Sequence, residues 1–227
     1  MNRATINTIN RRLLENLRNN TTDMAASETR IAASEFYCPD ILAAERQHLF
    51  INTPQPVAFS GELPGPGSYL ALQMLDIPVL LTRDERGQLR AFINACSHRG
   101  ARVASGSGEA RSLVCPFHGW AYALDGALRG RPEDGCFGTP VDDCALTPLA
   151  VSEKYGVVVV ALSVDVTQHA VDSALDEIGE HLEGLGFQHY RALERRHFDV
   201  AANWKLVSDL SLESYHFKTL HRDSVAR

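Results

Sequence analysis

Hydrophobic positions near the start of the chain repeat at helical spacing. Apolar residues recur every three or four positions, which places them along one face of an amphipathic helix. They are Ile6, Ile9, Leu13, Leu14 and Leu17. The pattern predicts a mainly helical N-terminal arm, which we assign to residues 1–50. We expect its apolar face to pack on the body of the protein or on a neighbouring subunit; contact with a membrane surface is the alternative.

The pattern changes to short β-like runs after this arm. Proline and glycine cluster between positions 54 and 67 and break the chain into turns. Two predicted hairpins follow, one turning at residues 84–87 and the other at Asp125-Gly126. The apolar run at residues 157–162 predicts a buried strand. Together these runs predict a small antiparallel β domain over residues 51–163.

Helical spacing returns in the last part of the chain. The predicted elements are a helix over residues 171–186, a strand over residues 197–203 and a helix over residues 204–221. Gly184 and Gly186 are expected to stop the first of these helices. No finished domain is recognisable before Arg227, so residues 164–227 predict the start of a second, incomplete domain.

Composition and charge narrow the range of functions. Hydrophobic residues make up 44% of the 227 positions and charged residues 22%. The formal net charge of -6 argues against a protein that neutralises nucleic-acid phosphates. No apolar run reaches the roughly 20 residues that span a bilayer, and the N-terminus lacks the apolar core of a secretory signal. We therefore expect a cytoplasmic protein that contacts neither nucleic acid nor membrane.

The five cysteines form two groups. An odd number without a secretory signal predicts reduced thiols rather than a disulfide framework. Cys38, Cys136 and Cys144 have no histidine at ligand spacing, and we interpret them as simple buried or half-buried thiols. Cys96 and Cys115 each precede a histidine at metal-ligand spacing and belong to a different kind of site.

Two short loops carry these cysteines and are the strongest chemical feature of the sequence. They are Cys96-Ser97-His98 and Cys115-Pro116-Phe117-His118, separated by sixteen residues. Each loop offers one thiolate and one imidazole. A zinc ion accepts such a set as a Cys₂His₂ tetrahedron. A Rieske [2Fe–2S] cluster takes both cysteines on one iron and both histidines on the other.

The arrangement of the two loops favours the cluster over zinc. Zinc modules usually pair two cysteines in one loop and two histidines in the other, whereas here each loop mixes the two ligand types. Gly100 and Gly119 follow the ligands, and glycine lets backbone amides approach the sulfurs closely. We therefore predict a Rieske cluster, with a zinc-stabilised interaction module as the alternative.

The motif has a familiar counterpart. CSHRGARV followed by CPFHGWAYALDG resembles the Rieske domain in the large (alpha) subunit of the ring-hydroxylating oxygenase family, and the resemblance covers about residues 35–221. Both loops lack the additional cysteine of respiratory Rieske proteins, so the low-potential type fits better. The resemblance implies an α+β fold, in which an antiparallel β Rieske domain precedes the beginning of an α+β, helix-grip-like catalytic domain.

A second group of possible ligands follows Asn203-Trp204-Lys205. Two histidines near a carboxylate, His216, His221 and Glu213, are typical of a non-haem Fe(II) site. Surface or capping residues are the alternative. Five positions turn about 140° around a straight helix. The two histidines can therefore face one iron only if the helix ends or widens between them.

The family resemblance gives these residues roles. It implies that His216 and His221 bind mononuclear Fe(II), and that Glu213 bridges this iron to His118 of a neighbouring subunit. Most members have aspartate at the position of Glu213, and many have asparagine at the position of Asp209. The family's third iron ligand is an aspartate far downstream. We therefore expect this chain to be the N-terminal part of an alpha subunit, or a shortened relative, and to bind mononuclear iron poorly.

The leading functional prediction is an oxygenase component. The resemblance implies electrons from a reductase or ferredoxin, O₂ as co-substrate, hydroxylation of a small organic molecule and a homo-oligomer, usually a trimer. We expect an aromatic substrate, although the family also includes enzymes for steroids and quaternary amines. A Rieske electron carrier and an inactive fragment that keeps only the cluster are the alternatives.

Overall fold

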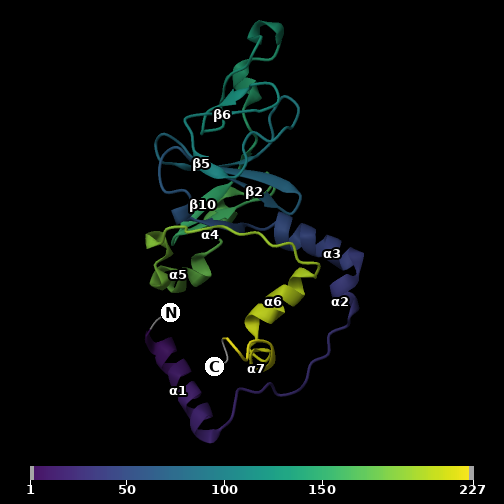
Figure 1. The fold of residues 1–227 in the computed structure, drawn as a ribbon, viewed down its shortest axis with the longest axis vertical. Helices are drawn as coiled ribbons and strands as arrows, with labels where there is room; N and C mark the ends of the chain where they lie inside the picture. Colours follow the sequence, from purple (N-terminus) through teal and green to yellow (C-terminus); the bar gives the residue numbers. More distant parts are fainter. Residues whose placement is uncertain (1–2, 225–227) are drawn as a thin grey trace. The chain divides into compact units, whose positions relative to one another are not determined.

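The computed structural model describes residues 3–224, which form two compact units. The first unit comprises Met1–Asp23 and Gln47–Leu193, and the second comprises Met24–Arg46 and Glu194–Arg227. Figure 1 shows the course of the chain through both units. None of the helices between residues 3 and 224 combines the length and apolar character that a bilayer crossing requires.

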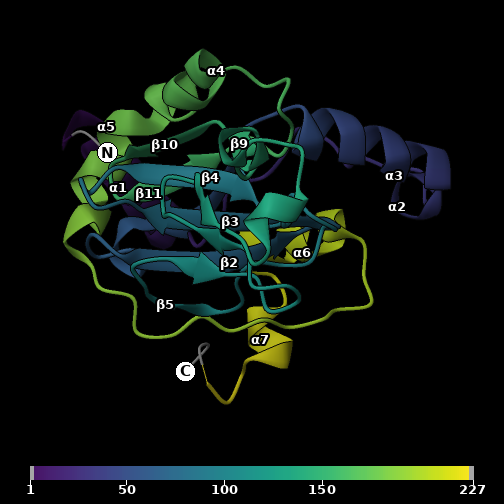
Figure 2. The same cartoon turned by 90° about the horizontal axis from the view of Figure 1, so that it is seen from above.

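Three antiparallel sheets form the body of the first unit (Figure 2). The first has the order β1-β11-β10: Gln55–Phe59, Val157–Val160 and Val151–Lys154. The second has the order β5-β2-β3-β4-β9: Ser107–Glu109, Ser68–Met74, Ile77–Arg83, Leu89–Ile93 and Pro148–Leu149. The third has the order β6-β7-β8: Leu113–Val114, Ala121–Tyr122 and Leu128–Gly130. The predicted antiparallel β architecture is confirmed.

Strand β3 separates two hydrophobic cores. Side chains alternate between the faces of a strand, so Leu80 packs into one core while Val79 and Leu81 pack into the other. The core around Leu80 also contains Cys96 and Cys115. The candidate ligand loops are therefore anchored to the same packed interior that stabilises the sheet.

The predicted turns and the predicted buried strand are observed. Residues 84–87 connect β3 to β4, and Gly87 donates a hydrogen bond from its amide to the Asp84 carbonyl. Gly126 has a φ of 90° between β7 and β8, a conformation that favours glycine. All four residues of β11 are buried. These features follow from local spacing and turn chemistry, which is why the sequence predicted them.

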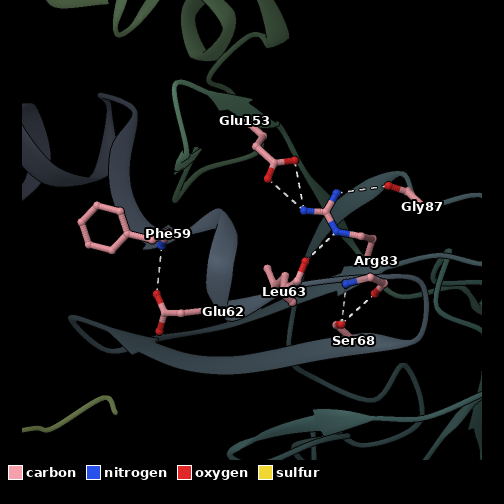
Figure 3. A network of polar contacts seen from close by, with 8 residues as sticks. Phe59, Glu62, Leu63, Ser68, Arg83, Gly87 and Glu153 are labelled. Atoms are coloured by element: carbon pink, nitrogen blue, oxygen red, sulfur yellow. Dashed lines mark hydrogen bonds and ion pairs between the residues drawn. The ribbon is translucent and has the colours of Figure 1, made fainter. Parts of the chain in front are cut away.

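The Arg83 side chain connects the second sheet to the first through hydrogen bonds and an ion pair (Figure 3). Its guanidinium donates to the carbonyls of Leu63 and Gly87 at 2.8 and 3.1 Å. A third nitrogen, Nη2, donates to both carboxylate oxygens of Glu153 on β10 at 2.9 and 3.1 Å. Burial alone would raise the pKa of Glu153, but the hydrogen bonds and charge of Arg83 hold that pKa below its ordinary value. The contact therefore joins β3 to β10 through an ionised pair.

The helix predicted over residues 171–186 is broken into shorter pieces. They are α4 at Gln168–Ser173, the 3₁₀ turn η5 at Asp176–Ile178, and α5 at Gly179–Leu185. Gly184 lies inside α5, and Gly186 ends it with a φ of 69°. A straight helix would separate Val171 from Phe187 by about 24 Å. The breaks instead let both residues pack on the core that contains Val157 and Val159.

The N-terminal arm is only partly helical. Helix α1 covers Arg3–Asn19, and α2, α3 and the π-helix η1 cover Ser34–Tyr37, Pro39–Glu45 and Arg46–Ile51. The intervening residues from Thr21 to Ala32 have no regular structure, so the helices of the arm are separated by an irregular segment. No residue of α1 is buried, and the predicted packing on the body of the protein is not seen among residues 3–224.

Two predictions for the second unit were wrong. Residues 197–203 form no strand, because they have no strand beside them to complete a hydrogen-bonded ladder among residues 3–224. The helix predicted over residues 204–221 is divided into α6 at Trp204–Leu212 and α7 at Phe217–Leu220. Between them, Glu213 is extended, with φ and ψ of -122° and 154°.

Candidate metal centre

The first ligand loop is closed by its own backbone. Cys96 lies just beyond β4, its amide donates to the Ala101 carbonyl at 2.8 Å, and the Gly100 amide donates to the Cys96 carbonyl at 2.8 Å. Gly100 has a φ of 71°, which an L side chain rarely adopts. The loop is therefore held as a tight turn around the Cys96 thiol.

The second loop, between β6 and β7, is built in the same way. The Cys115 amide donates to the Trp120 carbonyl at 2.8 Å, and the Gly119 amide donates to the Cys115 carbonyl at 3.0 Å. Gly119 also has a φ of 71°. The two loops thus carry their cysteine and histidine on similar backbone turns.

The two predicted cysteines share one buried core, and the two predicted histidines lie beside each other. The Cys96 and Cys115 side chains are buried free thiols, with residue exposures of 3% and 2%. The rings of His98 and His118 lie 4.6 Å apart between centroids, at an interplanar angle of 65°. His118 is exposed and His98 is half-buried, so one imidazole faces solvent while the other lies against the protein.

One ring nitrogen in this group has no partner. His98 Nδ1 is buried without a hydrogen bond among residues 3–224. An unpaired buried polar atom is costly, and a native structure normally satisfies it. A metal bond to this nitrogen removes that cost, so the atom is the natural ligand position of His98.

The donor set fits a two-iron cluster. A Rieske cluster takes two cysteines on one iron and two histidines on the other. Two buried thiols and two neighbouring imidazoles, one with an unpartnered nitrogen, meet that requirement.

Tyr122 lies beside the first thiol. Its hydroxyl oxygen is 3.2 Å from Cys96 Sγ and accepts a 3.0 Å hydrogen bond from the Ser97 amide. Because that oxygen already accepts, its own hydrogen is free to point at the sulfur. Burial, reinforced by the Cys96 contact, raises the pKa of Tyr122 to about 12. The hydroxyl therefore stays protonated at physiological pH and can donate to the Cys96 sulfur.

Aromatic side chains enclose His98. The Trp120 ring stacks on it at 5.0 Å with an interplanar angle of 4°, and the Phe137 ring meets it edge-on at 6.2 Å. Burial, together with the positive charges of His118 and Arg99, lowers the pKa of His98. The pocket therefore favours the neutral imidazole, which is the form that binds a metal.

The second predicted site lies on the divided helix of the second unit. His216 precedes α7 and His221 follows it, and their ring centroids are 5.3 Å apart. The Glu213 carboxylate lies 2.5 Å from His216 Nδ1. The hydrogen bond from His216 lowers the pKa of Glu213, so the carboxylate is ionised at neutral pH. The helix does end between the two histidines, which removes the angular obstacle of a straight helix.

Two family models match the chain. Residues 53–150 match the Rieske [2Fe-2S] domain, and residues 187–227 match the catalytic domain of the ring-hydroxylating alpha subunit. The chain belongs to the Rieske oxygenase alpha-subunit family. The first match includes both ligand loops, and the second includes Glu213, His216 and His221.

Individual relatives of this chain differ in the substrates that their names give. The chain is 31% identical to the glycine betaine monooxygenase oxygenase subunit of Chromohalobacter salexigens, over 81% of this chain and 41% of that protein. A quaternary ammonium Rieske monooxygenase superposes with a TM-score of 0.75 at 26% identity, over 85% of this chain and 54% of the other. Naphthalene 1,2-dioxygenase from Rhodococcus sp. superposes with a TM-score of 0.69 at 26% identity, over 81% and 44%. The chain thus spans about half the length of its relatives.

Three residues of this candidate centre were not singled out from the sequence. Trp120 and Tyr122 lie within the second motif, CPFHGWAY, so their proximity to the ligands was a usable signal. Arg131 lies outside both motifs, and its position beside Trp120 appears only in the fold. Nothing in its local sequence distinguishes it from the nearby Arg129.

Proposed function

We propose that this chain is part of an oxygenase alpha subunit and holds a [2Fe–2S] cluster through Cys96, Cys115, His98 and His118. The thiolates would hold one iron, and the neutral imidazoles would hold the other. The observation that carries this assignment is the buried His98 Nδ1 without a hydrogen-bond partner among residues 3–224, together with the two buried free thiols of the same two loops. When bound, such a cluster supplies one-electron transfer.

The protein's own residues have separate tasks in this proposal. Tyr122 donates a hydrogen bond to the Cys96 sulfur, and Trp120 holds the plane of the His98 ring. Burial of both cysteines keeps water away from the sulfur side. His118 and the neighbouring Phe117 are exposed, so electrons from a partner would enter or leave on their side.

The proposal extends to mononuclear Fe(II) at His216 and His221. Glu213 accepts a hydrogen bond from His216 Nδ1, which fixes the tautomer and leaves Nε2 free to bind a metal. In the family this carboxylate also connects the iron to the Rieske histidine of a neighbouring subunit. By the same reasoning, we propose a homo-oligomer, with a trimer as the expected form.

The reaction would be hydroxylation of a small organic substrate with O₂, using electrons from a reductase or ferredoxin. The glycine betaine relative and the structural match to a quaternary ammonium monooxygenase support a quaternary ammonium substrate. The match to naphthalene 1,2-dioxygenase keeps the aromatic class expected from the sequence as the second candidate. Substrate-dependent oxygen consumption with one compound of each class discriminates between them.

Metal analysis tests the core of the proposal. Protein purified without oxygen should contain two irons and two acid-labile sulfides per chain, and Cys96→Ser should lose both. Cys38→Ser is the matched control, because Cys38 lies outside both loops. Zinc without sulfide would overturn the assignment. A third iron, lost selectively in His216→Ala, would support the mononuclear site.

A further inference from the structure

A buried cation lies beside the candidate cluster. Arg131 follows β8, and its side chain is only 2% exposed. Its Nε lies 2.6 Å from the Asp134 carboxylate, and its Nη2 donates to the Thr139 carbonyl at 2.5 Å. Its Nη1 lies 3.6 Å from Cys144 Sγ. Removing a guanidinium from water costs free energy, so the presence of an arginine at this buried position needs an explanation.

The free face of this cation meets aromatic rings. Arg131 Cζ is 4.2 Å from the centroid of Phe137 and 5.1 Å from that of Trp120, within the range of cation–π attraction. Trp120 stacks on His98, and Phe137 meets both of these rings edge-on. Arg131 is therefore one aromatic ring away from a proposed cluster ligand, without touching it.

The charge of Arg131 is only partly neutralised. Its ion-pair partner Asp134 is 58% exposed, so water screens the carboxylate much more than the guanidinium. A second acceptor, the Thr139 carbonyl, is neutral. The guanidinium therefore contributes a positive field beside Trp120 that the exposed Asp134 carboxylate offsets only in part.

We propose that Arg131 is a positioning residue that clamps Trp120 against His98 and raises the reduction potential of the cluster. A buried positive charge stabilises the reduced cluster, which carries one more electron, over the oxidised one. The inference rests on the proposed function, because it requires the cluster on Cys96, Cys115, His98 and His118. Arg131 acts through the indole ring and through its field, not by binding iron.

A redox titration separates this role from a structural one. The midpoint potential of the cluster is measured for the parent chain, Arg131→Gln and Arg131→Lys, with electron paramagnetic resonance of the reduced state. A unit charge at roughly 10 Å and an effective dielectric constant of about 20 changes the reduced-to-oxidised ratio on the order of tenfold. Arg131→Gln should lower the ratio by about that factor, ~59 mV for one electron. Arg131→Lys should retain most of the parent value.

Two further variants control for charge and for damage. Arg129→Gln removes the same charge from an arginine that is 55% exposed and pairs with Glu85, and it should leave the potential unchanged. Asp134→Asn removes the compensating charge while keeping the cation, and it should raise the potential. Iron and sulfide contents equal to those of the parent show that the centre is intact.

The redox titrations either support or overturn the role proposed for Arg131. The proposal is overturned if Arg131→Gln has the parent potential with a full cluster, because Arg131 then only holds its loop. Where Arg131→Gln loses its cluster, Asp134→Asn decides, and an unchanged or lowered potential in that variant overturns the proposal. A parent chain without iron and sulfide would overturn the proposed function itself, which metal analysis reveals before any titration.

Discussion

At the scale of single residues, the contact between Tyr122 and Cys96 has the most direct chemical consequence. The Tyr122 hydroxyl accepts from the Ser97 amide and lies 3.2 Å from Cys96 Sγ. Hydrogen bonds to cluster sulfurs raise the reduction potential because they stabilise the added negative charge. The sequence places Tyr122 in the second motif, but only the fold brings it to the cysteine of the first.

Tyr122→Phe should therefore make the cluster harder to reduce. The ring is retained and only the hydroxyl is lost, so the expected effect is a roughly fivefold fall in the reduced-to-oxidised ratio at the parent midpoint, equivalent to about 1 kcal/mol. Tyr190→Phe is the matched control, since Tyr190 is exposed. A mediated redox titration measures both, and equal potentials would contradict the role given to Tyr122.

At the scale of elements, the joint between the two larger sheets depends on one pair of side chains. Arg83 on β3 reaches Glu153 on β10, and it also satisfies the carbonyls of Leu63 and Gly87 (Figure 3). The sequence predicted the strands but not this joint, because residues 83 and 153 are 70 positions apart. Strand identity is a local property, while the pairing of two sheets is not.

The ion pair between Arg83 and Glu153 should make the stability of the first unit fall at acidic pH. The pKa of Glu153 is lowered in the folded state, so its contribution is fully present above the ordinary glutamate pKa. The contribution is lost as pH falls through the lowered value. Glu153→Gln should reduce the free energy of unfolding by about 1–2 kcal/mol at neutral pH, and by less in acid.

Urea unfolding at neutral pH and at pH 4 or below measures this difference. Glu85→Gln is the matched control, because Glu85 is 75% exposed and its pair with Arg129 lies on the surface. A loss of stability that is the same at both pH values would show that the ionised pair is not responsible.

At the scale of the whole molecule, the proposed centre is concentrated in the first unit and the second histidine pair in the other. Both ligand loops lie within Gln47–Leu193, whereas Glu213, His216 and His221 lie within Glu194–Arg227. The core that contains Cys96 and Cys115 also contains Leu80 and Tyr122. Cluster binding should consequently stabilise the first unit, since a ligand that binds only the folded state favours it.

Removing the cluster with a chelator under reducing conditions tests this expectation. Hydrogen exchange should accelerate on the order of tenfold in residues 96–101 and 115–120, because the loops lose their shared metal centre. The amides of α6, Trp204–Leu212, serve as the internal control and should keep their rates. Unchanged exchange in both loops would show that they are folded independently of the cluster.

The sequence by itself determined the features that depend on short spacing. Loop ligands, hairpin turns and buried strands follow from neighbouring residues, because backbone sterics and side-chain alternation act over a few positions. The break at Glu213 has local partners, because the Glu213 carboxylate accepts hydrogen bonds from the amides of Tyr215 and His216. The tertiary structure decided the contacts of Trp120 with His98 and of Tyr122 with Cys96, which join the two loops. The absence of the strand predicted at residues 197–203 also depends on partners distant in the sequence. Packing, hydrogen bonding and burial select such partners only once the chain is folded.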